Sequence, residues 1–397
     1  MTIRLLSNVR AVLEDRVLDE ATIAIEDGLI VGVEADRHYA GTLDGDGQFC
    51  LPGLIDTHSD AIEREIVPRP NIHIDATFAL RSLEGRLSAA GITTASHGIS
   101  FEDSENRSRT VELASQLVGV ISTRRTSERA PVDHRILYRM PARSVTGLDA
   151  VIEHLSFGQA PGEQPILSFE DHTPGQGQYR DVERFKEYLR TVPLPEGEDA
   201  DSYIERRIAE GNALLAQRDA NLARVSELAQ SGVARVLVHD CEEALDMERA
   251  QAWGASIAEF PLTVGAASVA RQHGMPVVMG APNILRGGSH SGNIDAIELV
   301  RLGLCTSLAS DYLPSSLLAA VFLLVEQGVA TLSQAVALVT SGPAEVLGIS
   351  DRGRIAIGAR ADFALVDVDG RWPRVSRVIR AHAEGVEVGF SSMALAV

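Results

Sequence analysis

Short apolar runs that end in polar or small residues recur along most of this chain, each followed by a helix-prone stretch. This alternation is typical of parallel strands joined by helices, and about eight repeats are what a closed (β/α)8 barrel needs. We therefore predict an α/β fold of the TIM-barrel type over residues 51–342. The runs are CLPGLIDTH (50–58), GITTASHG (91–98), HRILYRM (134–140), PILSFEDH (165–172), ARVLVHD (234–240), ASIAEF (255–260), PVVMG (276–280) and TSLASD (306–311).

Both ends of the chain have a different pattern, in which short strand-like runs alternate with polar or Gly-rich turns. Near the start, the run 21–35 contains Asp27-Gly28, a strong hairpin signal. Near the end, residues 351–370 alternate in the same way. We expect residues 1–50 and 343–397 to form together a small β-sandwich domain. A chain of 397 residues also exceeds what one core usually supports, which favours a large and a small domain.

The charge balance and the apolar runs exclude several functions. The 36 basic and 55 acidic residues give a net charge of −19, which argues against a nucleic-acid or anionic-membrane surface. Charged residues interrupt the apolar run within residues 1–16, so no secretion signal is predicted. The apolar run 317–325 is too short to cross a bilayer and indicates a buried helix. The cysteines, 50, 241 and 305, are widely spaced, which indicates neither disulfides nor a structural zinc site. We expect a cytoplasmic protein with no nucleic-acid or membrane partner.

The segment 176–221 is long, charged and helix-prone. It follows the fourth predicted strand, and loops after the strands build the active-site face of such barrels. Two interpretations stay open for it: a lid over the site, or a helical excursion on the surface.

Residues that can bind metals stand at the ends of several predicted strands. His58 and Asp60 end the first, and their period-two spacing puts both side chains on one face of the strand, toward the barrel mouth. Imidazole nitrogens and carboxylate oxygens suit zinc or manganese. Convergence from several strands predicts a metal site, although helix caps or turn residues are equally good interpretations of Asp240 and Glu259. The further residues of this kind are Glu170, Asp171, His172, His239, Asp240, Glu259 and Asp311.

At this point the chain resembles the amidohydrolase superfamily over essentially its whole length. The segments that carry the resemblance are LPGLIDTHSD (51–60), SGPAEVLGI (341–349) and GRIAIGARADFALVD (353–367). The pattern departs from the superfamily at Asp60, where a second first-strand histidine is usual, and at Glu259, where a sixth-strand histidine is common. A closer resemblance, to members that serve phosphonate breakdown, rests on VPRP (67–70), EDHTPGQGQY (170–179), AEFPLT (258–263), GMPVVMGAPNILRGGSHSGN (274–293) and SDYLP (310–314).

The resemblance implies a metal-dependent hydrolase that cleaves a phosphoanhydride of a ribosyl triphosphate and releases pyrophosphate. It implies one or two divalent ions, zinc first, with manganese or iron as alternatives, and a homodimer. Asp311 would also act as general base, and Asp171 would bridge two metals or orient His172, with Glu170 as the other candidate for the bridge. The implied metal ligands are His58, Asp60, Asp171, His172, His239 and Asp311.

A triphosphate needs cationic donors, and arginine forks match phosphate oxygens in pairs. Arg69, Arg139 and Arg286 are our candidates, and Arg64 and Arg180 are equally well explained as surface residues. After Arg286 comes a Gly-rich stretch whose backbone N–H groups can bind an anion. In this stretch we assign Gly288, Ser289, His290 and Asn293 to substrate binding. For His290, contact with phosphate and contact with a metal are both open. His97 is interpreted as a structural residue.

Two alternatives to phosphoanhydride hydrolysis remain. A hydrolase or deaminase acting on a C–N bond of a small anionic substrate would use the same metal site and needs only one arginine. A metal-free barrel that serves as a scaffold would be expected to have lost its ligands, whereas this chain retains them.

Overall fold

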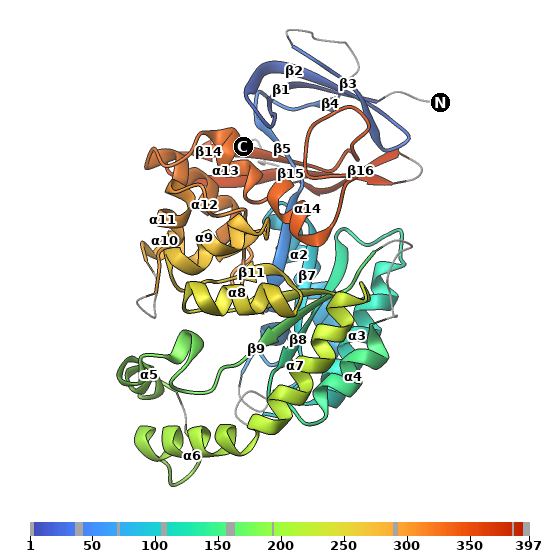
Figure 1. Ribbon diagram of the computed structural model, residues 1–397. Coiled ribbons are helices and arrows are strands. Elements are labelled where there is room, and N and C mark those ends of the chain that lie inside the picture. Colours follow the sequence, from blue (N-terminus) through green and yellow to red (C-terminus); the bar gives the residue numbers. More distant parts are fainter. Residues whose placement is uncertain are drawn as a thin grey trace.

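The computed structural model describes residues 4–35, 43–69, 72–104, 109–155, 163–192, 194–288, 293–382 and 385–391. Within these ranges the strands form two eight-stranded sheets, one closed into a barrel and one built from both chain ends (Figure 1). The predicted fold class is therefore confirmed.

The barrel sheet contains its strands in chain order, and all neighbours in it are parallel. The first and last strands meet at an isolated parallel bridge between Ser59 and Asp311. There the Asp60 N–H donates to the Asp311 carbonyl at 2.7 Å, and the Asp311 N–H donates to the His58 carbonyl at 2.9 Å. The barrel thus closes at its C-terminal mouth. The strands are β6 (Leu54–Ser59), β7 (Ile92–Ser100), β8 (Asp133–Pro141), β9 (Ile166–Glu170), β10 (Arg235–His239), β11 (Ala255–Glu259), β12 (Val277–Gly280) and β13 (Ser307–Ala309).

Helices follow the strands and bury their apolar residues against the sheet. The apolar run 317–325 lies in α12 and is largely buried, as predicted. Within the described ranges, no helix combines the length and apolarity that crossing a bilayer requires. The helices are α1 (Ala61–Ile66), α2 (Ala76–Ala89), α3 (Val111–Arg125), α4 (Gly147–His154), α7 (Leu215–Gln230), α8 (Ala244–Trp253), α9 (Val264–Gln272), α10 (Ala281–Arg286), α11 (Ala296–Arg301), α12 (Ser316–Glu326), α13 (Leu332–Ala337) and α14 (Ser341–Leu347).

The second sheet joins the two chain ends through β5, which pairs with β1 on one side and with β14 on the other. Residues of both ends share its core, among them Ile23 and Phe363. The predicted Asp27-Gly28 hairpin links β2 and β3, and both residues have positive φ, 49° and 77°. The predicted domain boundary at 342/343 lies inside α14, which packs against the barrel strands. The strands are β1 (Arg4–Val12), β2 (Val17–Glu26), β3 (Leu29–Glu34), β4 (Leu43–Asp44), β5 (Phe49–Pro52), β14 (Phe363–Asp369), β15 (Trp372–His382) and β16 (Gly385–Ser391).

The segment after β9 forms a small helical insertion that extends from one side of the barrel (Figure 1). It contains η2 (Gly177–Tyr179), α5 (Val182–Leu189) and α6 (Ala200–Ala213). Phe185, Leu189 and Ile204 form a separate small core within it. The insertion therefore has local packing of its own.

A buried ion pair connects the barrel to the chain that leads into the second sheet. Arg352 donates from Nη1 to the Asp133 carboxylate at 2.7 Å and to the Thr94 hydroxyl at 3.2 Å. Burial raises the pKa of Asp133, but Arg352 and the neighbouring Arg135 outweigh burial and hold this pKa well below its usual range. The ionised carboxylate is therefore the form that the fold stabilises.

We expect Asp133→Asn to lower the free energy of unfolding by about 3–5 kcal/mol, because it leaves buried arginines without their counter-charge. Since the pKa of Asp133 is lowered on folding, this contribution is present above the ordinary aspartate pKa of about 3.9 and is lost as the pH falls below it. Urea unfolding of both proteins at several pH values measures this. Asp367→Asn, which removes an exposed pair with Arg374, is the matched control and should change little. Equal effects of the two substitutions would contradict the role of the buried pair.

Candidate active site

A cavity of about 380 Å³ lies at the barrel mouth, where the strands end. Strand-end residues form one part of its wall, and the loops and the insertion form the rest. Among the residues that line it are His58, Asp60, Arg64, Arg109, Arg139, His172, Tyr179, Tyr188, His239, Asp240, Phe260, Arg286, Asn293, Asp311 and Tyr312. Most of the residues predicted for the site are therefore brought together here.

Three non-glycine residues with positive φ directly follow barrel strands at this mouth. They are Asp240 after β10 (φ 56°), Phe260 after β11 (φ 49°) and Asp311, shortly after β13 (φ 55°). Such backbone is uncommon for residues other than glycine, and strain of this kind clusters at functional sites. All three residues line the cavity. The backbone thus adopts a costly conformation where it presents side chains to the cavity.

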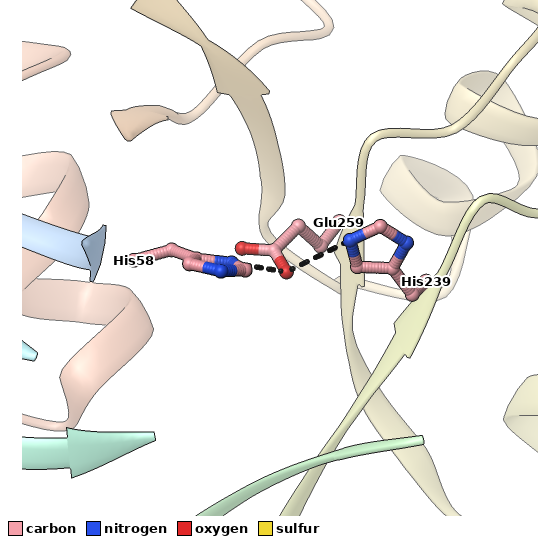
Figure 2. Close-up of side chains that lie close together, drawn as sticks. All are labelled: His58, His239 and Glu259. Carbon is pink, nitrogen blue, oxygen red and sulfur yellow. Dashed lines mark hydrogen bonds and ion pairs between the residues drawn. The ribbon is translucent and has the colours of Figure 1, made fainter. Parts of the chain in front are cut away.

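The described residues form two groups of possible metal ligands that share His239. In the first, Glu259 accepts from His58 Nδ1 at 2.9 Å and lies 3.6 Å from His239 Nε2. Figure 2 shows these three side chains pointing toward one another from different strands. In the second, Asp240 Oδ2 lies 2.8 Å from His239 Nδ1 and 3.5 Å from His172 Nε2. Ligand atoms within each group lie within 4.8 Å of one another.

Several of these ligand atoms are buried and have no hydrogen-bond partner. They are His172 Nε2, His239 Nδ1, Asp240 Oδ2 and Glu259 Oε1. Buried polar atoms in native proteins are nearly always satisfied, so an exception needs an explanation. Imidazole nitrogens with carboxylate oxygens are a common donor set for a divalent transition metal. The residues present therefore fit such an ion.

The charges of the site also call for a cation. Burial lowers the pKa of His58, but the Glu259 and Asp60 carboxylates outweigh it and hold this pKa well above its usual range. Burial also lowers the pKa of His239, but the Asp240 carboxylate outweighs it, and this pKa is raised to about 9. Burial and the Asp60 carboxylate raise the pKa of Asp311 to about 6. Carboxylates are thus in excess, and a divalent ion would take the place of the protons.

Arg139, which the sequence analysis assigns to phosphate, lines the cavity with most of its donors bound to carboxylates. Its guanidinium is buried and donates from Nε and Nη2 to Glu170 at 2.8 and 3.0 Å. Its Nη1 donates to both oxygens of Asp60, at 2.9 and 2.8 Å. Arg139 lies at the cavity wall, but these two carboxylates occupy most of its donors. Its role here is to hold Asp60 and Glu170 in place.

Two further predicted residues lie apart from the cavity wall. Asp171 accepts from Arg143 Nε at 2.9 Å and from the Thr173 hydroxyl at 2.7 Å, and it belongs to neither ligand group of the described residues. Glu170 likewise belongs to neither group of the described residues, and both of its oxygens accept from Arg139, so the choice between Asp171 and Glu170 as a bridge stays a prediction. Arg69 is exposed, with its backbone bridged to Ile72, and is absent from the described cavity lining.

The Gly-rich stretch after α10 is described only in part. Arg286 and Asn293 line the cavity, and Arg286 donates to the Asn283 side chain. Gly288 has φ 154°, a conformation that favours glycine. Ser289 and His290 lie outside the described residues, so their assignment to the substrate stays a prediction.

His97 lies on the outer side of β7 and takes no part in the cavity. It contacts His134 through Nε2 and Nδ1 at 2.9 Å, and His134 in turn contacts Glu84 at 2.9 Å. Its environment is that of the structural residue that the sequence predicts.

Sequence reasoning missed Arg109 and Gly98. Arg109 precedes α3, outside any predicted strand end, yet it lines the cavity and pairs with Glu63 and Glu102 at 2.8 and 2.6 Å. Gly98 follows His97 in β7, and a Cβ there would lie 2.6 Å from Asp60 Oδ1 and 3.1 Å from His58 Nε2. The need for a glycine at this position becomes visible only when neighbouring strands are placed side by side.

A parallel barrel with convergent histidines and carboxylates at its mouth is the arrangement found in barrel hydrolases. Comparisons with known proteins specify the family: residues 49–391 match the Amidohydrolase family. The chain is also 33% identical, over 94% of its length and 100% of the relative's, to the alpha-D-ribose 1-methylphosphonate 5-triphosphate diphosphatase of Escherichia coli strain K12. This protein therefore belongs to the amidohydrolase family and is a hydrolase of that superfamily.

Solved structures support the same fold. The 5-methylcytosine deaminase from Klebsiella pneumoniae matches with a TM-score of 0.64 at 15% identity, covering 99% of this chain and 98% of its own. The N-isopropylammelide isopropylaminohydrolase from Burkholderia multivorans matches with a TM-score of 0.61 at 17% identity, covering 97% and 98%. At such low identity these structures establish the architecture alone.

We expect His239→Ala to abolish stoichiometric metal retention, because His239 belongs to both ligand groups. The loss of affinity should exceed the roughly 10–100-fold typical when an outer-shell partner of a metal ligand is removed. Metal content after dialysis, measured by elemental analysis, tests this. His273→Ala removes an exposed histidine paired with Glu248 and should leave metal content unchanged. Full retention in His239→Ala would show that the metal binds elsewhere.

Gly98→Ala should displace Asp60 and lower metal content, because the new methyl group overlaps the carboxylate. Overpacking of this kind costs typically about 1–3 kcal/mol of stability. Gly119→Ala, in α3 with no atom within 4 Å of the new Cβ, should instead stabilise the protein by roughly 0.5–1 kcal/mol. Thermal unfolding and metal analysis of both variants separate the two effects. Wild-type metal content in Gly98→Ala would refute the tight contact.

Proposed function

We propose that this protein hydrolyses the phosphoanhydride of α-D-ribose 1-methylphosphonate 5-triphosphate and releases pyrophosphate, in phosphonate catabolism. The observation that carries the proposal is the 33% identity to the Escherichia coli diphosphatase, which extends over the full length of that relative. An alignment of this extent includes the barrel mouth and the loops around it, where specificity resides.

The arginines of the cavity support a polyanionic substrate. Arg64 and Arg286 line it although the whole chain carries a net charge of −19, and Arg109, which pairs with Glu63 and Glu102, lines it as well. Arg64 lies with its guanidinium carbon 5.0 Å from the centre of the Tyr312 ring, and it makes no carboxylate ion pair within the described part of the chain. Guanidinium groups gathered against the overall charge suit phosphate oxygens. A C–N hydrolase with a small anionic substrate would need one such group.

The roles of the residues follow from their positions. A divalent metal at the His58, His239 and Glu259 group would activate water and draw charge from a phosphoryl oxygen. Asp311 accepts a proton from the attacking water, because its carboxylate faces the cavity while its backbone is fixed to His58. The arginines bind the phosphates and orient the anhydride.

We propose zinc as the ion, because two imidazoles and a glutamate form a common catalytic zinc set. Manganese or iron suits the same mixed donors. Metal exchange into the stripped protein, followed by activity measurement with each ion, decides among them. A homodimer in the cytoplasm is also part of this proposal.

The direct test is pyrophosphate release from α-D-ribose 1-methylphosphonate 5-triphosphate by metal-loaded protein. We expect EDTA treatment and His58→Ala to abolish it. Arg286→Gln should raise KM by about 10–100-fold, since a hydrogen bond to a charged group contributes roughly 1.5–3 kcal/mol. Arg301→Gln, which removes an exposed arginine paired with Glu298 on α11, is the matched control and should leave KM unchanged.

Other outcomes discriminate among the alternatives. Full metal content without phosphoanhydride cleavage, but with hydrolysis of a cyclic amide, would establish the C–N hydrolase in place of the diphosphatase. Absence of bound metal after gentle purification, with no activity on either substrate, would favour the metal-free scaffold.

A further inference from the structure

A second hollow of about 750 Å³ adjoins the catalytic cavity, between the helical insertion and the loops after β7. Three residues, Arg109, His172 and Tyr179, line both spaces. His172 belongs to the ligand group that also contains His239 and Asp240, so this group lies at the boundary between the two spaces. We call this space the insertion hollow.

The insertion supplies the aromatic wall of this hollow. Tyr179, from η2, lies with its ring centre 4.1 Å from that of Phe185 and 6.1 Å from that of His172. Tyr203, on α6, packs against the same small core and also lines the hollow. Aromatic rings with a polar tip suit ligands that have both apolar faces and hydroxyl groups.

The charged residues of the hollow are matched to one another. Arg206 pairs with Glu198 at 2.5 Å and with Glu210 at 2.7 Å, and Arg207 lies 3.8 Å from Glu210. Glu102 faces the hollow and pairs with Arg109. Donors and acceptors thus stand side by side in the wall of the hollow. Hydroxyl groups, which both donate and accept, fit such a wall.

The insertion is fixed to the barrel close to its tyrosines. The Gly177 N–H donates to Glu242 at 2.7 Å, and a Cβ at Gly211 would lie 2.7 Å from Arg143 and 2.8 Å from Thr173. Both contacts join the insertion to residues at the C-terminal ends of barrel strands. The aromatic wall is therefore held in a defined position beside His172.

We propose that the insertion hollow binds the sugar end of the substrate, the ribosyl 1-methylphosphonate with its free hydroxyl groups, while the catalytic cavity holds the triphosphate chain. This inference rests on the proposed function and adds a specificity site to it. The ester link between the sugar and the α-phosphate then lies at the boundary beside His172, and the anhydride bond to be cleaved lies just inside the catalytic cavity. The insertion acts as the element that distinguishes ribosyl triphosphates from inorganic polyphosphates.

The test uses the full-length, metal-loaded double variant Tyr203→Phe/Arg207→Gln, which keeps the Tyr203 ring in its small core. KM for the ribosyl triphosphate should rise about 10-fold, because two polar contacts to the sugar are lost. Turnover of inorganic tripolyphosphate should stay unchanged, because that substrate occupies the catalytic cavity alone. Arg190→Gln, an exposed arginine at the end of α5 outside the hollow, is the control and should change neither.

Direct binding makes the inference independent of turnover. Calorimetric titration with the product, α-D-ribose 1-methylphosphonate 5-phosphate, should give an affinity that falls about 10-fold in the double variant. If wild-type protein binds this sugar phosphate with that dependence but releases no pyrophosphate, the proposed function fails and the hollow stands. Equal losses on both substrates, no loss on either, or no sugar-phosphate binding by the wild type would each overturn the hollow as a sugar site.

Discussion

The closure of the barrel between β6 and β13 is the constraint on which the site depends. Two backbone hydrogen bonds join Asp311 to His58 and Asp60, so the bonds that close the fold also set the distance between site residues. Two residues before His58 in β6, Asp56 accepts from the Ser310 N–H at 3.0 Å and from its hydroxyl at 2.5 Å. These site residues lie on backbone whose hydrogen bonds close the barrel. They therefore cannot move apart unless the barrel opens. This is why strand ends provide more exact sites than free loops.

Much of this arrangement could be predicted from the sequence. The eight apolar runs became the eight strands, and His58, His172, His239 and Asp311 meet at the mouth because parallel strands end at one edge. Side-chain direction could not be predicted: Asp171 and Glu170 are neighbours, yet one turns to Arg143 and the other into the barrel. The carboxylate partners of Arg139 could not be predicted for a similar reason, because they come from segments far away in sequence. Spacing along one strand carries no information about such partners.

Asp240 and Glu259 illustrate the same limit. From sequence, each was as well explained by a cap or a turn as by a ligand. Their side chains prove to be members of the two ligand groups, with buried oxygens that lack a hydrogen-bond partner. That property depends on burial from several elements together. It becomes visible only once the barrel is closed around the residues.

Asp60 and Glu259 each bring a negative charge to the barrel interior. Unpaired buried carboxylates are costly, so the added charge must be met by cations. Arg139 provides one of these, through its fork to Asp60 and Glu170. Glu259 is met by His58 and His239, whose pKa values the neighbouring carboxylates raise. Arg139 therefore balances the charge that Asp60 brings into the barrel, and without it the Asp60 carboxylate would lack its main counter-charge.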